Sequence, residues 1–205
     1  MRGEPLKAVF LTAAFYSLAG VIAVSASVMA LAEYQRWSLN LTTCMPVGFY
    51  QRGPVPRHLR VGDRVFFCPP VNSPAMRQAM SGRWLEYSPH GKWACADRLR
   101  PFMKFVVALP GQRVTVAKQG VIADGKRLPN SRVVTGIADG RIKVIHLPYA
   151  TYTVPKGDFW DYAPGNFAFT SVYYGPVPVK SILGSMRPVP YLTIPGSQFW
   201  LKVGR

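Results

Sequence analysis

Two residues of this chain have side chains that could together break a peptide bond. Cys44 lies in the segment Asn40-Leu-Thr-Thr-Cys-Met-Pro-Val-Gly-Phe-Tyr50, and Lys104 is the only charged residue of the apolar run 102–109. A thiol has a reference pKa of about 8.5, far closer to neutrality than a serine hydroxyl, so it needs less help from a base. Burial disfavours the ammonium form of a lysine and can make it a proton acceptor. Nucleophile and base are the first requirements of acyl transfer.

Each of these residues also has an ordinary structural explanation. An isolated cysteine before Met-Pro could be a small buried hydrophobe, and a lysine in a strand could extend from its face into solvent. Thr42 lies two residues before Cys44, so in an extended strand the two side chains share a face while Thr43 points to the other. The Thr42 hydroxyl and the Cys44 backbone N–H could then stabilise an oxyanion, although threonine also simply favours strands.

Other arrangements of reactive side chains are weaker. His58, His90 and His146 are far apart and lack the spacing of metal ligands, and the sequence has no glycine-rich phosphate loop. Asp158 and Asp161 could be paired carboxylates, but their neighbours are typical of a turn that leads into a strand. We therefore expect no metal and no cofactor.

The first positioning element is an uncharged stretch near the N-terminus. Residues 8–32, between Lys7 and Glu33, form 25 residues without a charge, and a helix needs about 20 apolar residues to cross a bilayer. A cleaved signal peptide is the alternative, because 30–32 resembles a cleavage site, but its apolar region is usually only about 7–15 residues long. Positive charges before the span indicate a cytoplasmic N-terminus, which places the rest of the chain in the periplasm.

Beyond the span, the sequence predicts one mostly β domain. Short runs rich in Val, Phe, Ile and Tyr alternate with turn residues, and the 19 prolines and 18 glycines of the chain interrupt most possible helices. The predicted strands are 63–67, 102–109, 112–117, 120–123 and 172–174. The best candidate for a helix is 72–83, with Pro74 in its first turn and Gly82 at its end.

The expected organisation has three parts. They are a cytoplasmic tail over 1–7, a transmembrane helix over 8–32 and a periplasmic domain over 33–205, in which 69–100 forms a cap insertion at one edge of the sheet. An odd number of cysteines in an oxidising compartment leaves one thiol over. Cys68 and Cys95 each lie beside loop residues and form the natural disulfide pair, which leaves Cys44 free, although the sequence also permits the other pairings.

The outer part of the chain is strongly basic. Beyond residue 7 it has 23 Lys plus Arg against 8 Asp plus Glu, a net charge of +15. Such a charge could hold the domain against anionic lipid head groups or attract an acidic partner. The charges are scattered and form no recognisable nucleic-acid module. We therefore expect the inner membrane lipid as a partner and no specific nucleic acid.

Several segments, taken in order, resemble the S26 signal-peptidase superfamily, and more closely its TraF-type peptidases of conjugative transfer. The segment 40–50 is similar to the nucleophile box, 61–70 to the strand that follows it, 103–111 to the lysine box, and 173–178 with 182–184 to the last box. The resemblance implies a signal-peptidase-like irregular β domain on one membrane helix. It also implies that Cys44 is the nucleophile, in place of serine, and that Lys104 is the general base.

The chain departs from the family pattern at several positions. Phe105 stands where the family has Arg after the lysine, and Gln112 stands where it has Asp. The last box of the family begins Asp-Ser-Arg, whereas this chain has Thr170, Ser171 and a valine there. The resemblance therefore predicts that the acid that orients the lysine is missing. Thr170 or Ser171 would replace it with a hydrogen bond near Lys104.

The function implied by this resemblance is pilin maturation. Family members process pilin precursors, and some join the pilin ends into a ring through an acyl-enzyme. We expect a membrane-anchored peptidase or transpeptidase of a conjugative type IV secretion system, with an extended pilin precursor as substrate and other conjugation subunits as possible partners. The alternatives are a non-catalytic pilin-binding scaffold on the same fold and a general type I signal peptidase. Cys44 fits a natural Cys–Lys variant, an engineered Ser-to-Cys change or a degenerate relative that no longer cleaves.

Overall fold

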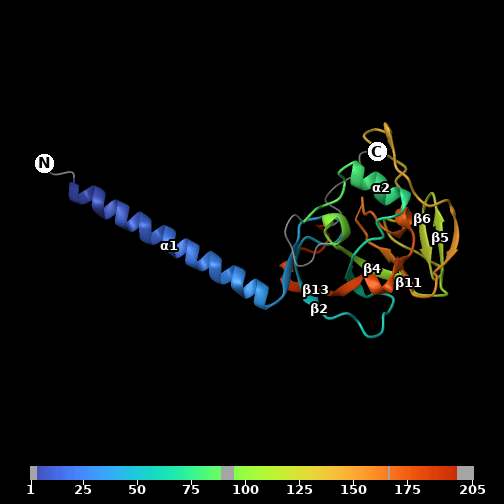
Figure 1. The fold of residues 1–205 in the computed structure, drawn as a ribbon, viewed down its shortest axis with the longest axis horizontal. Coiled ribbons are helices and arrows are strands. Elements are labelled where there is room, and N and C mark those ends of the chain that lie inside the picture. The colour runs from blue at the N-terminus through green and yellow to red at the C-terminus, as the bar shows by residue number, and fades with distance from the viewer. Residues whose placement is uncertain (1–3, 89–94, 166, 198–205) are drawn as a thin grey trace. The chain divides into compact units, whose positions relative to one another are not determined.

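The computed structural model describes residues 4–88, 95–165 and 167–197 (Figure 1). The chain divides into two compact units, with the boundary between Ser38 and Leu39. The first unit contains helix α1, Glu4–Tyr34. Its part Leu11–Tyr34 is long and apolar enough to cross a membrane by length and composition. The helix includes the stretch 8–32 that the sequence indicated and continues beyond it at both ends.

The second unit is built on a seven-stranded sheet in the order β1-β2-β13-β3-β4-β11-β12. Its strands are β1 (Trp37–Asn40), β2 (Gly48–Gly53), β3 (Arg64–Phe67), β4 (Phe102–Ala108), β11 (Asp158–Tyr162), β12 (Val177–Pro178) and β13 (Ile182–Thr193). The pairs from β2 through to β12 are antiparallel. Neighbours in this sheet come from distant parts of the chain, so the fold joins residues that the sequence separates.

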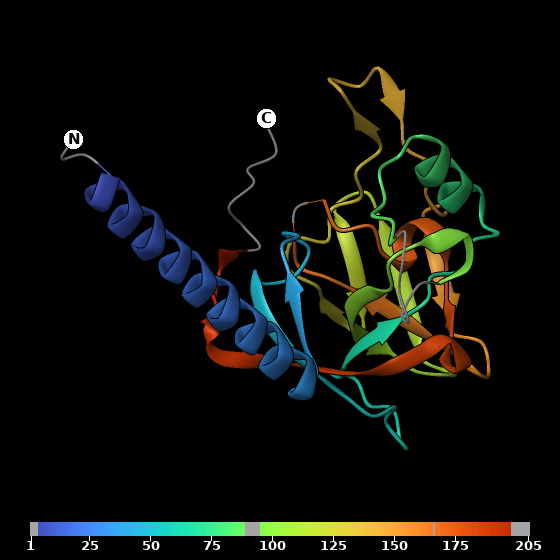
Figure 2. The same cartoon turned by 60° about the vertical axis from the view of Figure 1, so that its left-hand side comes forward.

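A smaller sheet packs beside the first. It has the order β10-β5-β6-β7, and a separate hairpin is formed by β8 and β9. The bounds are β5 (Arg113–Ala117), β6 (Gly120–Ala123), β7 (Lys126–Arg127), β8 (Gly136–Ile137), β9 (Ile142–Lys143) and β10 (Ala150–Thr153). Figure 2 shows the hairpin, in gold, projecting from the domain. Side chains from both sheets, such as Phe67, Val106, Val114 and Trp160, share one buried core.

The predicted helix 72–83 is confirmed as α2, Pro74–Ser81. Ser73 caps it by accepting a hydrogen bond from the Met76 N–H at 3.1 Å, proline occupies the first turn, and Gly82 ends the helix. The short helix η1 (Ala96–Arg98) follows in the same insertion. A disulfide joins Cys68 to Cys95, with 5.4 Å between their Cα atoms. The part 89–94 of the expected cap lies outside the described residues.

The predicted strands 63–67, 102–109, 112–117 and 120–123 are confirmed as β3, β4, β5 and β6. The predicted strand 172–174 is wrong, because Ser171–Tyr174 forms the one-turn helix α3. The N–H of Gly175 donates to the Ser171 carbonyl at 2.8 Å, and the four residues of the turn are buried. Valine and tyrosine indicated burial here and not an extended backbone.

The long strand β13 was not predicted, because its prolines are typical of a loop or of a strand edge. Pro188 pairs with Tyr50 of β2, and the register then shifts before Thr193 pairs with Gly48. Tyr191 lies inside this irregular stretch with a φ of 61°. A backbone bulge therefore accommodates residues that could not continue a regular ladder. The short helix η2, Val179–Ser181, leads into β13.

Candidate active site

The candidate nucleophile lies on a loop that leaves the sheet directly after β1. This strand ends at Asn40, so the extended strand expected around Thr42 is wrong, and the loop turns between 41 and 46 instead. Cys44 is half-buried and is the free cysteine of the described residues. The next side chain, Met45, is only 1% exposed and anchors the loop to the domain.

The side-chain amide of Asn40 stabilises this loop through hydrogen bonds. Its Nδ2 donates to the carbonyl oxygens of Thr42 at 3.0 Å, Met45 at 3.3 Å and Pro46 at 3.0 Å. Its Oδ1 accepts from the Thr42 N–H at 3.2 Å and from the Thr42 hydroxyl at 2.7 Å. One planar group therefore holds the backbone on both sides of Cys44.

This arrangement changes the expected part of Thr42. A hydroxyl has one proton to donate, and in Thr42 that proton goes to Asn40. It is therefore not available to an oxyanion in this conformation. The backbone N–H of Cys44, in contrast, has no acceptor within the described ranges of the chain, so it is free to donate to a substrate oxygen.

The segment around Gly165 packs closely against the backbone of Thr43 and Cys44. The N–H of Gly165 donates to the Cys44 carbonyl at 3.2 Å. A Cβ atom at Gly165 would lie 2.0 Å from the Thr43 carbonyl oxygen and 2.7 Å from the Cys44 Cα. Only a glycine allows this approach of two backbones.

Replacing Gly165 by alanine is therefore expected to displace the loop that carries Cys44. We expect at least about a tenfold loss of Cys44 reactivity toward substrate, because misplacement of a reacting group by about 1 Å can cost 100-fold. The measurement is the rate of acyl-enzyme formation. Gly140→Ala is the control, since nothing lies within 4 Å of a Cβ there and only its positive φ of 83° is strained. Equal losses in both variants would contradict a local effect at Cys44.

Lys104 lies in the middle of β4 and is only 4% exposed. It pairs with Val65 of β3, and its Nζ lies 5.5 Å from the centre of the Phe102 ring. Across residues 4–88, 95–165 and 167–197, no hydrogen bond or ion pair within 4.0 Å holds this amine. A buried amine without a fixed partner is suited to exchange a proton with a neighbouring group.

A buried acid that the last box did not include lies near Lys104 on another strand. Asp161 is completely buried and pairs with Val106 across the β4–β11 ladder. Lys104 lies two residues from Val106 along β4, so its side chain and that of Asp161 point to the same face of the sheet. The strand context expected for Asp161 is right, but its carboxylate faces the buried lysine.

Asp161 is held by two hydroxyl groups. Its Oδ1 accepts from Ser171 at 2.5 Å and from Tyr174 at 2.8 Å, while Oδ2 has no partner in the described part of the chain. Burial raises the pKa of Asp161 from the usual 3.8 to about 6, although the Ser171 hydrogen bond and the Lys104 charge act in the opposite direction. Burial therefore favours the protonated acid, whereas the hydroxyl groups and the lysine charge favour the carboxylate.

Tyr174 connects this cluster to the nucleophile. Burial raises its pKa well above the usual value, and the Asp161 carboxylate and a nearby Cys44 thiolate raise it further. The tyrosine hydroxyl consequently keeps its proton and acts as a donor. Lys104, Asp161, Tyr174 and Cys44 thus form a continuous set of neighbours, although they come from β4, β11, α3 and the loop after β1.

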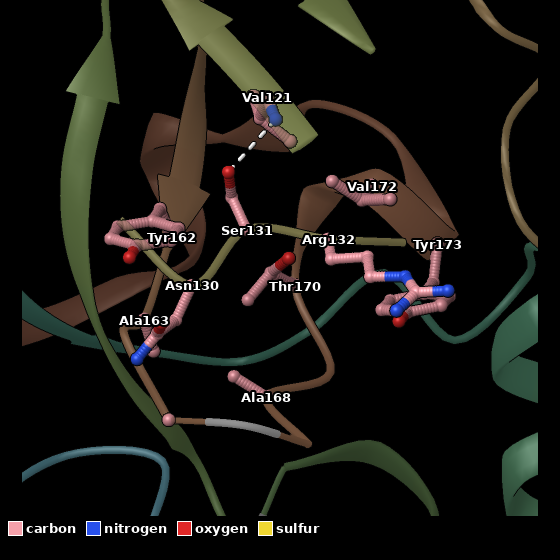
Figure 3. Close-up of a pocket in the computed structure, with 11 residues that line it drawn as sticks. Val121, Asn130, Ser131, Arg132, Tyr162, Ala163, Ala168, Thr170, Val172 and Tyr173 are labelled. Carbon is pink, nitrogen blue, oxygen red and sulfur yellow. Dashed lines mark hydrogen bonds between the residues drawn. The ribbon is translucent and has the colours of Figure 1, made fainter. Parts of the chain in front are cut away.

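The two residues proposed to orient the lysine have different surroundings. Ser171 belongs to the cluster, because its hydroxyl contacts Asp161. Thr170 instead lines a small cavity of about 20 Å³ beside Ser131, Arg132 and Tyr173 (Figure 3). This volume is enough for a water molecule. Thr170 is therefore placed at the cavity, and the contact with the acid comes from its neighbour.

The buried acid also gives a pH dependence of stability. Its pKa lies at about 6 in the folded chain against a usual 3.8, so the folded state binds more protons between these values and stability falls as pH rises through that window. We expect this group to cost about 2 kcal/mol at pH 7 relative to pH 4, and Asp161→Asn to remove that difference. Denaturant unfolding of the full chain in detergent at both pH values measures it. Asp158→Asn, on the same strand, is the control and should keep the wild-type difference.

Sequence reasoning missed Asn40, Gly165 and Tyr174 as members of the site. Asn40 stood within the quoted segment, but only its contacts reveal what it does. Gly165 carries no side chain, so its sole signal was a glycine after a proline. Of the two disulfide cysteines, Cys68 directly precedes the insertion 69–100 and Cys95 lies within it.

The second unit therefore carries a free, half-buried thiol on a turn and, on its main sheet, a buried lysine and a buried acid. The chain belongs to the family described as signal peptidase, peptidase S26, which it matches over residues 8–191. Among the relatives is the conjugal transfer protein TraF of Agrobacterium fabrum, which is 33% identical over 176 residues, or 85% of this chain and 93% of that protein.

A second relative and one solved structure are also similar to this chain. A probable conjugal transfer protein TraF of Sinorhizobium fredii is 32% identical over 188 residues, which are 92% of this chain and 90% of that protein. Among solved structures, a signal peptidase I from Enterococcus faecalis covers 64% of this chain and 98% of its own, with 17% identity and a TM-score of 0.34.

Proposed function

We propose that this chain is a membrane-anchored peptidase or transpeptidase that processes the pilin precursor of a conjugative type IV secretion system. Membership of the S26 peptidases supports the reaction class, and the names of the similar TraF proteins support a role in conjugal transfer. Helix α1 would be the anchor in the bacterial inner membrane. The charged flank before it would keep the N-terminus cytoplasmic and the catalytic domain in the periplasm.

The observation that carries the proposal is the continuous cluster from Cys44 to Lys104. Tyr174 lies close enough to Cys44 for a thiolate there to raise its pKa, and it donates to Asp161. The positive charge of Lys104 in turn lowers the pKa of Asp161. Together these contacts support Cys44 as the nucleophile, Lys104 as the base and Asp161 as its counter-charge.

The proposed reaction begins when the Cys44 thiol gives its proton to Lys104 Nζ. The sulfur attacks the backbone carbonyl carbon of the peptide bond that follows a small side chain in the precursor. The Cys44 N–H donates to the oxyanion that forms. The C–N bond then breaks, and the leaving amine takes a proton from the Lys104 ammonium. Asp161 stabilises that ammonium as an ionised neighbour and takes no proton itself.

The thioester left on Cys44 has two possible acceptors. Attack by water gives a shortened linear pilin, and attack by the amine of the pilin itself gives a cyclic product. In both cases the C–S bond breaks and the thiolate recovers a proton. Thioesters react readily with amines, so cysteine in place of serine suits the transfer reaction.

The test is intact-mass spectrometry of the full chain after incubation with the pilin precursor of its conjugation system. A mass increase equal to a pilin fragment, located on Cys44 by peptide mapping and removed by hydroxylamine, is the expected result. Uncut pilin bound to unmodified Cys44 would instead support the non-catalytic scaffold. Equal cleavage of unrelated secretory precursors would support a general type I signal peptidase.

A further inference from the structure

We propose that Asn40 is a positioning residue that holds the Cys44 backbone N–H in place as the oxyanion donor. This role rests on the proposed function, because it concerns the same acyl-transfer step. Within the described residues, no hydrogen bond joins Asn40 to the Cys44 side chain. It would therefore act through the backbone of the loop.

The side chain of Asn40 makes an unusually large number of contacts with this loop. Five hydrogen bonds join Asn40 to residues before and after Cys44. The loop between 41 and 46 has no ladder partner that could fix its shape in the same way. Its conformation consequently depends on the amide of Asn40 more than on its own backbone hydrogen bonds.

These contacts also occupy the backbone carbonyl oxygens of the loop. Asn40 Nδ2 donates hydrogen bonds to the carbonyl oxygens of Thr42, Met45 and Pro46. The Gly165 N–H donates a hydrogen bond to the carbonyl oxygen of Cys44. Because these oxygens are held by donors, they do not compete with a substrate oxygen for the Cys44 N–H. That N–H has no acceptor in the described chain, as a preorganised oxyanion donor requires.

The contacts of Asn40 require both the donor and the acceptor atoms of a side-chain amide. Asparagine carries one acceptor and two N–H donors on a single planar group, and this loop uses both kinds. Aspartate would keep the acceptor for Thr42 but would turn a carboxylate toward three carbonyl oxygens. Alanine would remove every contact. The two substitutions therefore separate the donors from the acceptor of Asn40.

The experiment compares two reactions of Cys44 in the full chain. Alkylation by iodoacetamide is a displacement that forms no oxyanion, whereas acylation by the p-nitrophenyl ester of acetylalanine passes through one. We expect Asn40→Ala and Asn40→Asp to slow acylation about 10- to 100-fold, in the range found for weakened oxyanion donors. We expect alkylation to change less than about threefold, since the thiol and its base remain.

The matched control is Thr42→Val, which has the same shape and removes only the hydroxyl that donates to Asn40. It should slow acylation less than Asn40→Ala does. A larger loss in Thr42→Val would show that the Thr42 hydroxyl is itself the oxyanion donor and would overturn the role given to Asn40. Full acylation by Asn40→Asp would also overturn it, because the donors of the amide would then be dispensable.

Two other outcomes are decisive. Equal falls in acylation and alkylation, with a lower melting temperature, would reduce Asn40 to a structural residue and contradict the proposal. A wild-type chain that is alkylated but never acylated would instead contradict the proposed peptidase function. The failure of one proposal can therefore be told from the failure of the other.

Discussion

Replacing Cys44 by alanine is expected to abolish acyl-enzyme formation and to reduce pilin processing by about 10⁴-fold or more, the scale of loss found when a covalent nucleophile is removed. The reason is that no other described cysteine is free, since Cys68 and Cys95 are joined in a disulfide. Water could attack the substrate only without a covalent intermediate. Intact-mass spectrometry and gel analysis of the pilin precursor measure both effects.

Cys44→Ser gives the matched comparison, because it restores the nucleophile of the family pattern. A serine hydroxyl holds its proton far more strongly than a thiol with its reference pKa of about 8.5, so it depends more on a base. We expect an adduct that forms more slowly and, being an oxygen ester, resists neutral hydroxylamine. Normal pilin maturation by Cys44→Ala would contradict covalent catalysis and leave the scaffold as the better explanation.

The sequence was most informative where function and local pattern coincide. Cys44 and Lys104 stood out because each is chemically unusual among its neighbours, and the structure places both near one buried cluster. The strands around Lys104 and the capped helix α2 also followed from local residue types. In these segments, burial, turn residues and caps lie within a few positions of one another.

Asp161 could not be assigned in this way, because its role depends on strand register. Thirteen positions separate Asp161 from Tyr174, yet their side chains share a hydrogen bond, and Lys104 is farther still along the chain. The family pattern directed attention to Thr170, which the structure places at a small cavity. The sequence pattern gave no sign that an acid on another strand, Asp161, would lie near Lys104.

The turn around Cys44 was hidden for a related reason. Threonines in the segment before it favour strands, and the sequence does not show that Asn40 and Gly165 constrain the backbone from two sides. Likewise, β13 contains prolines that weaken any strand prediction, but pairing with both β2 and β3 holds it in the sheet. Long-range contacts overrode the local preference in both segments.

Replacing Lys104 by methionine is expected to slow acylation of Cys44 about 10²- to 10⁴-fold, the usual contribution of a general base. Methionine fits a buried strand position and has no proton to exchange. The measurement is the rate of nitrophenol release from the acetylalanine ester together with pilin cleavage. Lys126→Met, at an exposed position in β7, is the control and should leave both rates unchanged.

Lys104→Arg decides which property of the lysine matters. Arginine keeps the positive charge opposite Asp161 but cannot give up its proton in a protein. If Lys104 accepts the thiol proton, the arginine variant should be as slow as the methionine variant. If arginine retains most of the rate, Lys104 serves only as a cation that favours the thiolate, and the base must be sought elsewhere. Because Asp161 remains buried in each variant, melting temperatures measured alongside separate a failure of folding from a failure of proton transfer.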